Sequence, residues 1–138
     1  MRSETLLDFM GVAEHLKCNM RHSRMTDHRR ESVAEHTYRL CVFAWLVKEE
    51  FPDCDMDKVM KMCLFHDLGE ALTGDISAFV KTDDDRKTEG DALTLLTAML
   101  PGKERQELDE LFGELEREET MEAKIVHALD KMETLIQH

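Results

Sequence analysis

The segment that follows Asp55 restricts the possible folds of this chain more than any other part of the sequence. Asp55 or Asp57 can cap a helix there, and its apolar side chains cover most of the helix circumference: Val59, Met60, Met62, Cys63, Leu64 and Phe65. A helix that is apolar nearly all round is buried, so other elements have to pack around it. His66 and Asp67, which follow directly, then stand at the end of a buried helix.

The elements that can pack around this helix are other helices. Residues 4–17 carry apolar side chains at helical spacing. Ser32-Val33-Ala34-Glu35 matches a capping box, in which the serine hydroxyl and the glutamate carboxylate satisfy amides at a helix start. This motif predicts a helix from about Val33 to Glu50, and on it Phe43 and Trp45 are expected to fill the core.

Breaks in the sequence separate the remaining elements. Pro52 and Pro101-Gly102 interrupt the helices, and the polar stretch from Cys18 to Glu31 is expected to be a loop or a short irregular helix. No segment has a convincing strand pattern, and further helices are expected over residues 87–99, 103–117 and 120–137. We therefore predict an all-α fold, a single bundle of about six helices over residues 1–138.

The charge of the chain limits its possible partners. Its 138 residues include 30 Asp and Glu against 18 Lys and Arg, which gives a formal net charge of -12. A field of this sign repels the phosphate backbone of nucleic acids, so a long nucleic acid partner is not expected. A small anionic substrate is compatible with this charge, because a bound metal and one or two basic side chains reverse the potential inside a pocket.

The cysteines and the first residues predict a location for the protein. Cys18, Cys41, Cys54 and Cys63 show no CxxC spacing, and residues 1–16 alternate charged and apolar side chains instead of forming a signal-peptide core. No apolar run approaches the roughly 18 residues that a membrane span needs. We therefore expect reduced thiols and a cytoplasmic protein that has no membrane partner.

Four residues that can bind a metal stand on three different predicted helices. His36 lies one turn into its helix, His66 and Asp67 end another, and Asp130 lies on the last. Imidazole nitrogens and carboxylate oxygens suit Zn, Mn, Fe, Co or Ni, and converging helices can supply four such ligands inside a bundle. Taken singly, each of these residues is as readily a hydrogen-bonded or surface polar group.

The sequence around these residues carries a family resemblance. Four segments resemble the H…HD…D signature of the HD superfamily: Glu31–His36, Leu64–Glu70, Leu72–Ile76 and His127–Lys131. Within that superfamily they are most similar to the bacterial 5′-deoxynucleotidases and related small HD hydrolases. The resemblance runs from about Arg21 to Asp130 in the right order, and it implies a helical metal-dependent phosphohydrolase.

The resemblance implies a role for each residue at a matched position. His36, His66, Asp67 and Asp130 would be the metal ligands, with water and a substrate phosphate oxygen at the remaining positions. Glu70 lies three residues after Asp67, so a continuing helix puts it on the ligand face. In the resembling enzymes a glutamate here works with the metal-bound water, and a capping or solvated acid in a turn is the alternative for Glu70.

Further positions are implied to contact substrate. Asp75 lies in a Thr-Gly-Asp sequence that is by itself an ordinary turn, and the resemblance puts it near the sugar or the leaving oxygen. Arg21 stands fifteen residues before His36, where the deoxynucleotidases have an arginine that contacts substrate and can pair with a phosphate. His22 replaces the tryptophan of those enzymes, which leaves base and sugar preference open. Lys81 is a second phosphate candidate, with a solvated loop charge as its alternative.

The histidine count predicts one metal per active site. A second metal in HD proteins generally needs further histidines between the HD pair and the final aspartate. His127 is the only histidine between Asp67 and Asp130, and it is either close to the ligands or merely packed. This argues against the di-iron oxygenases and the dinuclear phosphodiesterases of the superfamily.

The favoured reaction is the hydrolysis of a nucleoside or deoxynucleoside 5′-monophosphate to the nucleoside and phosphate. One alternative is another mononuclear HD hydrolase, acting on a different phosphoester or on a nucleoside triphosphate. The sequence offers no crowded set of Lys and Arg for a triphosphate. The other alternative is a regulatory or binding module that holds the metal without turnover.

The resemblance also implies a homodimer, and it raises a question about the end of the chain. The sequence stops eight residues after Asp130, earlier than many of the resembling proteins. Two alternatives follow from this. Either the fold is minimal, or a C-terminal helix that closes the pocket is absent.

Overall fold

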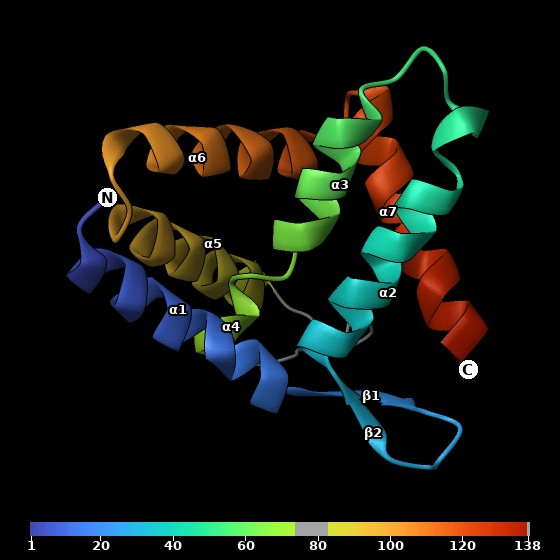
Figure 1. Ribbon diagram of the computed structural model, residues 1–138, viewed down its shortest axis with the longest axis horizontal. Coiled ribbons are helices and arrows are strands. Elements are labelled where there is room, and N and C mark those ends of the chain that lie inside the picture. Colours follow the sequence, from blue (N-terminus) through green and yellow to red (C-terminus); the bar gives the residue numbers. More distant parts are fainter. Residues whose placement is uncertain (74–82, 138) are drawn as a thin grey trace.

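Helices account for most of the residues that the structure, a computed structural model, describes, which are 1–73 and 83–137 (Figure 1). The elements in chain order are α1 (Ser3–Cys18), β1 (Met20–Arg24), β2 (Arg30–Ser32), α2 (Val33–Leu46), the 3-10 turn η1 (Lys48–Glu50), α3 (Met56–Phe65), α4 (Glu70–Thr73), α5 (Asp83–Ala98), α6 (Gly102–Arg117) and α7 (Met121–Gln137). The predicted helical bundle is confirmed. Within the described residues no helix is both long and apolar enough to cross a lipid bilayer.

The capping box at the start of α2 is formed as predicted. The Ser32 hydroxyl accepts from the Glu35 amide at 3.1 Å, and the Glu35 carboxylate accepts from the Ser32 amide at 3.0 Å. The predicted end of this helix is wrong by four residues, because α2 stops at Leu46 and η1 follows it. Pro52 disfavours helical geometry only in the residue before it, Phe51, which follows η1.

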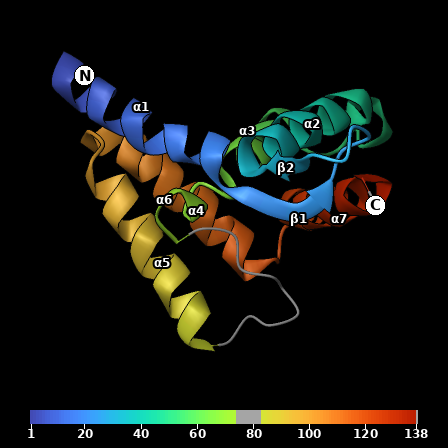
Figure 2. The same ribbon diagram turned by 90° about the horizontal axis from the view of Figure 1, so that it is seen from below.

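The stretch after α1 is a β-hairpin, so the prediction of a loop or an irregular helix is wrong there. β1 and β2 pair antiparallel, with Met20 opposite Ser32 and Arg24 opposite Arg30. His28 takes a left-handed backbone conformation in the turn, with φ 69°. The sequence signal was weak because β1 has one apolar residue, and the hairpin is stabilised by packing against α2 and α7 (Figure 2).

Two expectations about the core are also corrected. Val59, Met62 and Cys63 of α3 are fully buried, but Leu64 is 52% exposed, so α3 is covered on one side only. Trp45 of α2 is 54% exposed, and the ammonium group of Lys48 lies 3.9 Å from the centre of its ring. Phe43 does pack against the core, as expected.

The packing of three helices prepares the site. α2, α3 and α7 pack on one another, and α1 packs on α2 and α4, while α5 lies between α4 and α6 (Figures 1 and 2). The Asp55 carboxylate caps α3 by accepting from the Lys58 amide at 3.1 Å. The three helices that pack together are the same three that carry or end at the four predicted metal ligands.

Candidate metal centre

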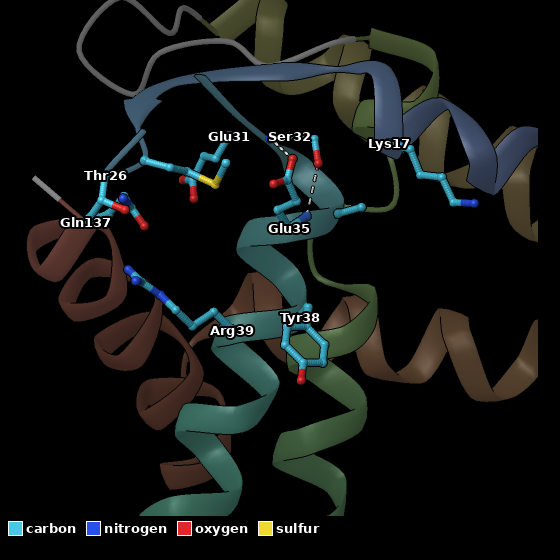
Figure 3. Close-up of a pocket in the computed structure, with 10 residues that line it drawn as sticks. Lys17, Thr26, Glu31, Ser32, Glu35, Tyr38, Arg39 and Gln137 are labelled. Carbon is cyan, nitrogen blue, oxygen red and sulfur yellow. Dashed lines mark hydrogen bonds between the residues drawn. The ribbon is translucent and has the colours of Figure 1, made fainter. Parts of the chain in front are cut away.

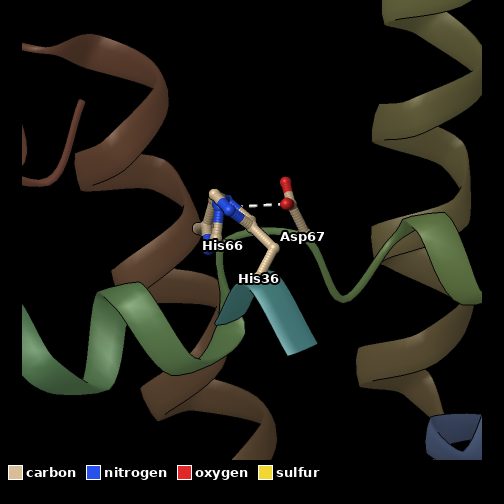
Figure 4. A group of neighbouring side chains, drawn as sticks. All are labelled: His36, His66 and Asp67. Atoms are coloured by element: carbon tan, nitrogen blue, oxygen red, sulfur yellow. Dashed lines mark ion pairs between the residues drawn. The ribbon is translucent and has the colours of Figure 1, made fainter. Parts of the chain in front are cut away.

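The structure brings all four predicted metal ligands together. His36 comes from α2, and His66 and Asp67 follow directly after α3; these three side chains lie together in Figure 4. Asp130 comes from α7. His36 Nε2 lies 2.6 Å from Asp130 Oδ1, and His66 Nε2 lies 2.9 Å from Asp67 Oδ2 and 3.4 Å from Asp130 Oδ1. One donor atom each from His36, His66 and Asp67 also lie within 4.8 Å of one another.

His66 is oriented as a metal ligand would be. Its Nδ1–H donates to the carbonyl of Cys63 at 2.7 Å, so the lone pair of the neutral ring is on Nε2, which faces the two carboxylates. That buried Nε2 atom makes no well-aligned hydrogen bond within residues 1–73 and 83–137. A divalent cation would satisfy this atom, so the residues present fit a metal.

His36 has the same division between its two ring nitrogens. Nε2 faces Asp130, while Nδ1 lies 2.5 Å from Oε2 of Glu133, a buried residue of α7. Glu133 also accepts a hydrogen bond from Nε of Arg39 at 2.7 Å. Neither Glu133 nor Arg39 was predicted from the sequence. The available signal was the spacing of Glu133, three residues after Asp130 and so on the same side of α7.

The electrostatics of this group favour positive charge. Burial acts to lower the pKa of His36, but the hydrogen bonds that its ring donates to the carboxylates of Asp130 and Glu133 outweigh burial and raise that pKa to about 9. The pKa of His66 is also raised, because the charges of Asp67 and Asp130 outweigh its burial. Burial acts to raise the pKa of Asp67 and of Asp130, yet both lie below the ordinary value because of the two imidazoles. Protons and a metal cation would therefore compete for the same atoms.

Arg21 of β1, predicted to contact substrate, lies beside the predicted ligand Asp67. Its Nη1 is 3.8 Å from Asp67 Oδ2, its Nε donates to Glu31 Oε1 at 3.0 Å, and its Nη2 donates to the Thr134 hydroxyl at 3.1 Å. Glu31 is buried; desolvation and the charge of Glu133 raise its pKa, and Arg21 acts to lower it. Glu31, which was not predicted, therefore holds the guanidinium in place.

The other predicted residues are placed less centrally, or lie outside the described part of the chain. His22 is exposed and alternates with Arg21 along β1, so its side chain is on the other face of the strand. Glu70 is half-buried and begins α4, and its amide donates to the carbonyl of Asp67 at 3.0 Å. The helix does not continue from His66 to Glu70 as expected, because turns separate α3 from α4. Asp75 and Lys81 lie outside the described residues.

His127 is turned away from the ligands. Its Nε2 lies 3.0 Å from the carbonyl of Leu115 and 3.4 Å from the carboxylate of Glu118, at the C-terminal end of α6. These contacts favour the interpretation that His127 is merely packed over the interpretation that it lies close to the ligands.

A cavity of about 620 Å³ lies between the hairpin and α2, and none of the four predicted ligands lines it (Figure 3). Its lining includes Arg39, Glu31, Tyr38 and Gln137. Two of these residues contact the neighbours of the predicted ligands: Arg39 donates to Glu133, which faces His36, and Glu31 accepts from Arg21.

Comparisons with known proteins agree with this geometry. Residues 13–138 match the profile of a family described as HD domain. The 5′-deoxynucleotidase HDDC2 of Homo sapiens is 34% identical over 111 residues, which are 79% of this chain and 53% of that protein. The protein of the same name from Xenopus laevis is 32% identical, over 97% of this chain and 68% of that protein. The chain thus spans about half the length of the human relative.

A solved structure is also similar. The crystal structure of a predicted metal-dependent phosphohydrolase from Magnetospirillum magnetotacticum MS-1 superimposes with a TM-score of 0.88 at 30% sequence identity. The match covers 99% of this chain and 70% of that chain. A conserved hypothetical protein from Pyrococcus furiosus is also 30% identical, with a TM-score of 0.76 over 95% of this chain and 76% of that chain.

Proposed function

Because this chain belongs to the HD domain family, we propose that it is a metal-dependent phosphohydrolase that acts on nucleoside or deoxynucleoside 5′-monophosphates. The observation that carries the proposal is the convergence of His36, His66, Asp67 and Asp130 from three helices, with both Nε2 atoms facing carboxylates. The name 5′-deoxynucleotidase, which its relatives bear, supports the substrate class. We further propose that residues 1–138 act as one domain.

The donor set suits one divalent transition metal. Two imidazole nitrogens and two carboxylates accept Mn, Co, Zn, Ni or Fe, and availability decides among them. When bound, such a cation supplies polarisation of a phosphate oxygen and lowers the pKa of a water molecule. We propose a single metal, because a second one would need a further histidine ligand. The candidate for that role, His127, bonds to the end of α6.

The reaction adds water to phosphorus and breaks the bond from phosphorus to the 5′-oxygen of the sugar. Arg21 binds the phosphate through its Nη atoms, because Glu31 and Thr134 hold the guanidinium beside Asp67. Glu70 takes the proton of the attacking water, and a proton goes to the leaving 5′-oxygen on the side that we assign to Asp75. The products are the nucleoside and phosphate.

The two remaining substrate-binding candidates, Lys81 and His22, are treated differently in this proposal. Lys81 is a second cation that can approach a phosphate. We leave His22 out of the site, because its exposed side chain is on the other face of β1 from Arg21. Base and sugar preference therefore have to come from other residues.

The test is phosphate release from metal-stripped protein to which Mn, Co, Zn, Ni or Mg is added. The panel contains ribonucleoside and deoxynucleoside monophosphates and triphosphates. We expect metal-dependent release from monophosphates, lost at least 100-fold in Glu70→Gln and unchanged in Glu116→Gln, which makes the same charge change on the exposed side of α6. Metal binding without release from any nucleotide would contradict the proposal and favour a metal-holding regulatory module.

We also propose a cytoplasmic homodimer. Tyr38, Trp45 and Leu46 form an exposed apolar face on α2, and the described cysteines are in no disulfide. A face of this kind suits a second copy of the chain. Light scattering should give twice the monomer mass for the natural protein and the monomer mass for Trp45→Glu. A monomeric natural protein would refute the dimer without bearing on the reaction.

A further inference from the structure

Glu133 is a buried carboxylate with no place in the proposed reaction. It is 1% exposed and lies between two partners on α2. Its Oε2 faces Nδ1 of His36 at 2.5 Å, and its Oε1 accepts from Nε of Arg39 at 2.7 Å. Arg39 also donates to the backbone carbonyl of Glu133 at 3.3 Å. Each oxygen of this buried carboxylate therefore accepts from a different side chain, Oε2 from His36 and Oε1 from Arg39.

These contacts argue against a second metal at this position. Donor atoms of Glu31, His36 and Glu133 lie close enough together to hold an ion. Each carboxylate, however, already pairs with a guanidinium, Glu31 with Arg21 and Glu133 with Arg39. A cation between them would add charge to a group that two arginines already balance. The arrangement is better explained by its effect on His36.

A histidine binds a metal through one nitrogen while the other carries its proton. At His66 the proton is on Nδ1, because the carbonyl of Cys63 accepts it. At His36 the acceptor is a side chain, and that side chain is held by Arg39. Arginine only donates hydrogen bonds, so it fixes Oε1 of Glu133 and leaves Oε2 for His36.

We propose that Glu133, held by Arg39, is a positioning residue that keeps His36 in the tautomer with a proton on Nδ1 and a lone pair on Nε2. The inference rests on the proposed function, since it assumes that His36 binds the metal through Nε2. It deepens that function because part of the affinity for the metal would then depend on the Glu133–Arg39 ion pair, which contacts His36 at Nδ1 and not at the nitrogen that binds the metal. Loss of such an outer partner typically weakens metal binding about 10- to 100-fold.

The amide variant Glu133→Gln tests the tautomer directly. Arg39 would draw the amide oxygen, because it offers only donors, and the amide N–H group would then face Nδ1 of His36. That nitrogen would have to accept, so the proton would move to Nε2 and block the metal. We expect Co²⁺ affinity, followed by visible absorption in a chelator competition, to fall about 10- to 100-fold.

The double variant Glu133→Gln with Arg39→Met supplies the decisive comparison. Without Arg39 the amide can rotate and offer its oxygen to His36, so the double variant should bind Co²⁺ at least fivefold more tightly than Glu133→Gln alone. A purely structural role predicts the opposite, because a second buried partner has been removed. Arg39→Met alone keeps the carboxylate, and its side chain is 43% exposed, so it should fold and bind with a loss of a few-fold.

The controls separate failure of this inference from failure of the proposed function. Glu116→Gln should bind Co²⁺ like the natural protein, and circular dichroism of each metal-free variant checks its fold. Unchanged affinity in Glu133→Gln, or a double variant that is no better than Glu133→Gln, would overturn the tautomer assignment. A natural protein that binds no metal would instead overturn the proposed function.

Discussion

At the scale of single residues, Arg21 has a position that predicts a specific kinetic effect. Arg21→Lys keeps the charge but loses the paired Nη donors and the hydrogen bond to Glu31. We expect KM for a monophosphate to rise about 10- to 100-fold, which corresponds to the 1.5–3 kcal/mol typical of charged hydrogen bonds. Co²⁺ affinity should not change, since Arg21 is not a ligand.

Steady-state kinetics check this prediction, with Arg24→Lys as the matched control. Arg24 is an exposed arginine on the same strand, and its guanidinium donates to the carbonyl of His28 in the turn of the hairpin. An equal rise in KM in both variants would mean that the substitutions disturb the strand, and it would contradict a specific contact of Arg21 with phosphate.

Single residues also show what the sequence could reveal about the site. The four proposed ligands and Arg21 stand in motifs with fixed neighbours and spacing, so a resemblance predicts them. Glu31 and Glu133 are two of 30 acidic residues, and residue type does not distinguish them from solvated charges. The spacing of Glu133 after Asp130 places it on the same side of α7 but does not show that it is buried. What sets them apart is burial beside a guanidinium, which depends on the pairing of β1 with β2 for Glu31 and on the packing of α2 against α7 for Glu133.

At the scale of elements, the junction of α3, α6 and α7 predicts a pH dependence. Glu114 of α6 pairs with Lys58 of α3 at 3.1 Å and accepts from the Thr120 hydroxyl at 2.7 Å. Burial acts to raise the pKa of Glu114, but these two hydrogen bonds outweigh it and hold the pKa below 4.5. The stability they contribute is therefore fully present above pH 4.5 and is lost as the pH falls through the pKa of the folded state.

Glu114→Gln should lower the free energy of unfolding by about 1 kcal/mol at neutral pH. The difference from the natural protein should shrink as the pH is lowered below about 4.5, because both proteins are then uncharged at this position. Urea unfolding at several pH values measures it, with Glu116→Gln as the control for the charge change. A difference that does not depend on pH would assign the effect to packing.

Elements also differ in how well the sequence predicts them. α1, α2 and α6 have caps, breaks or apolar periodicity that act within a few residues, so their positions follow from local signals. The hairpin has no such signal, because β1 is polar and gains its stability from α2 and α7. The exposure of Leu64 and Trp45 was not predicted for a related reason. Side-chain type shows which residues can be buried, but burial also requires a neighbouring element that packs over them.

At the scale of the whole molecule, the metal is expected to add stability, because its ligands come from three helices that pack together. With free Co²⁺ at about 100 times its dissociation constant, the free energy of unfolding should rise by about 2.7 kcal/mol. Urea unfolding with and without a chelator measures this difference. Asp130→Asn should remove most of it, and an equal response in that variant would locate the metal elsewhere.

The distance along the chain between the ligands sets the order in which the site can be assembled. His36 and Asp130 are 94 residues apart. A ribosome that adds about 5 to 20 residues per second exposes His36 roughly 5 to 20 s before Asp130. During that interval the nascent chain offers only a partial donor set, which holds ions weakly. The proposed donor set is therefore complete only after residue 130 has emerged, so the metal is expected to bind after this part of the chain has been made and not during its synthesis.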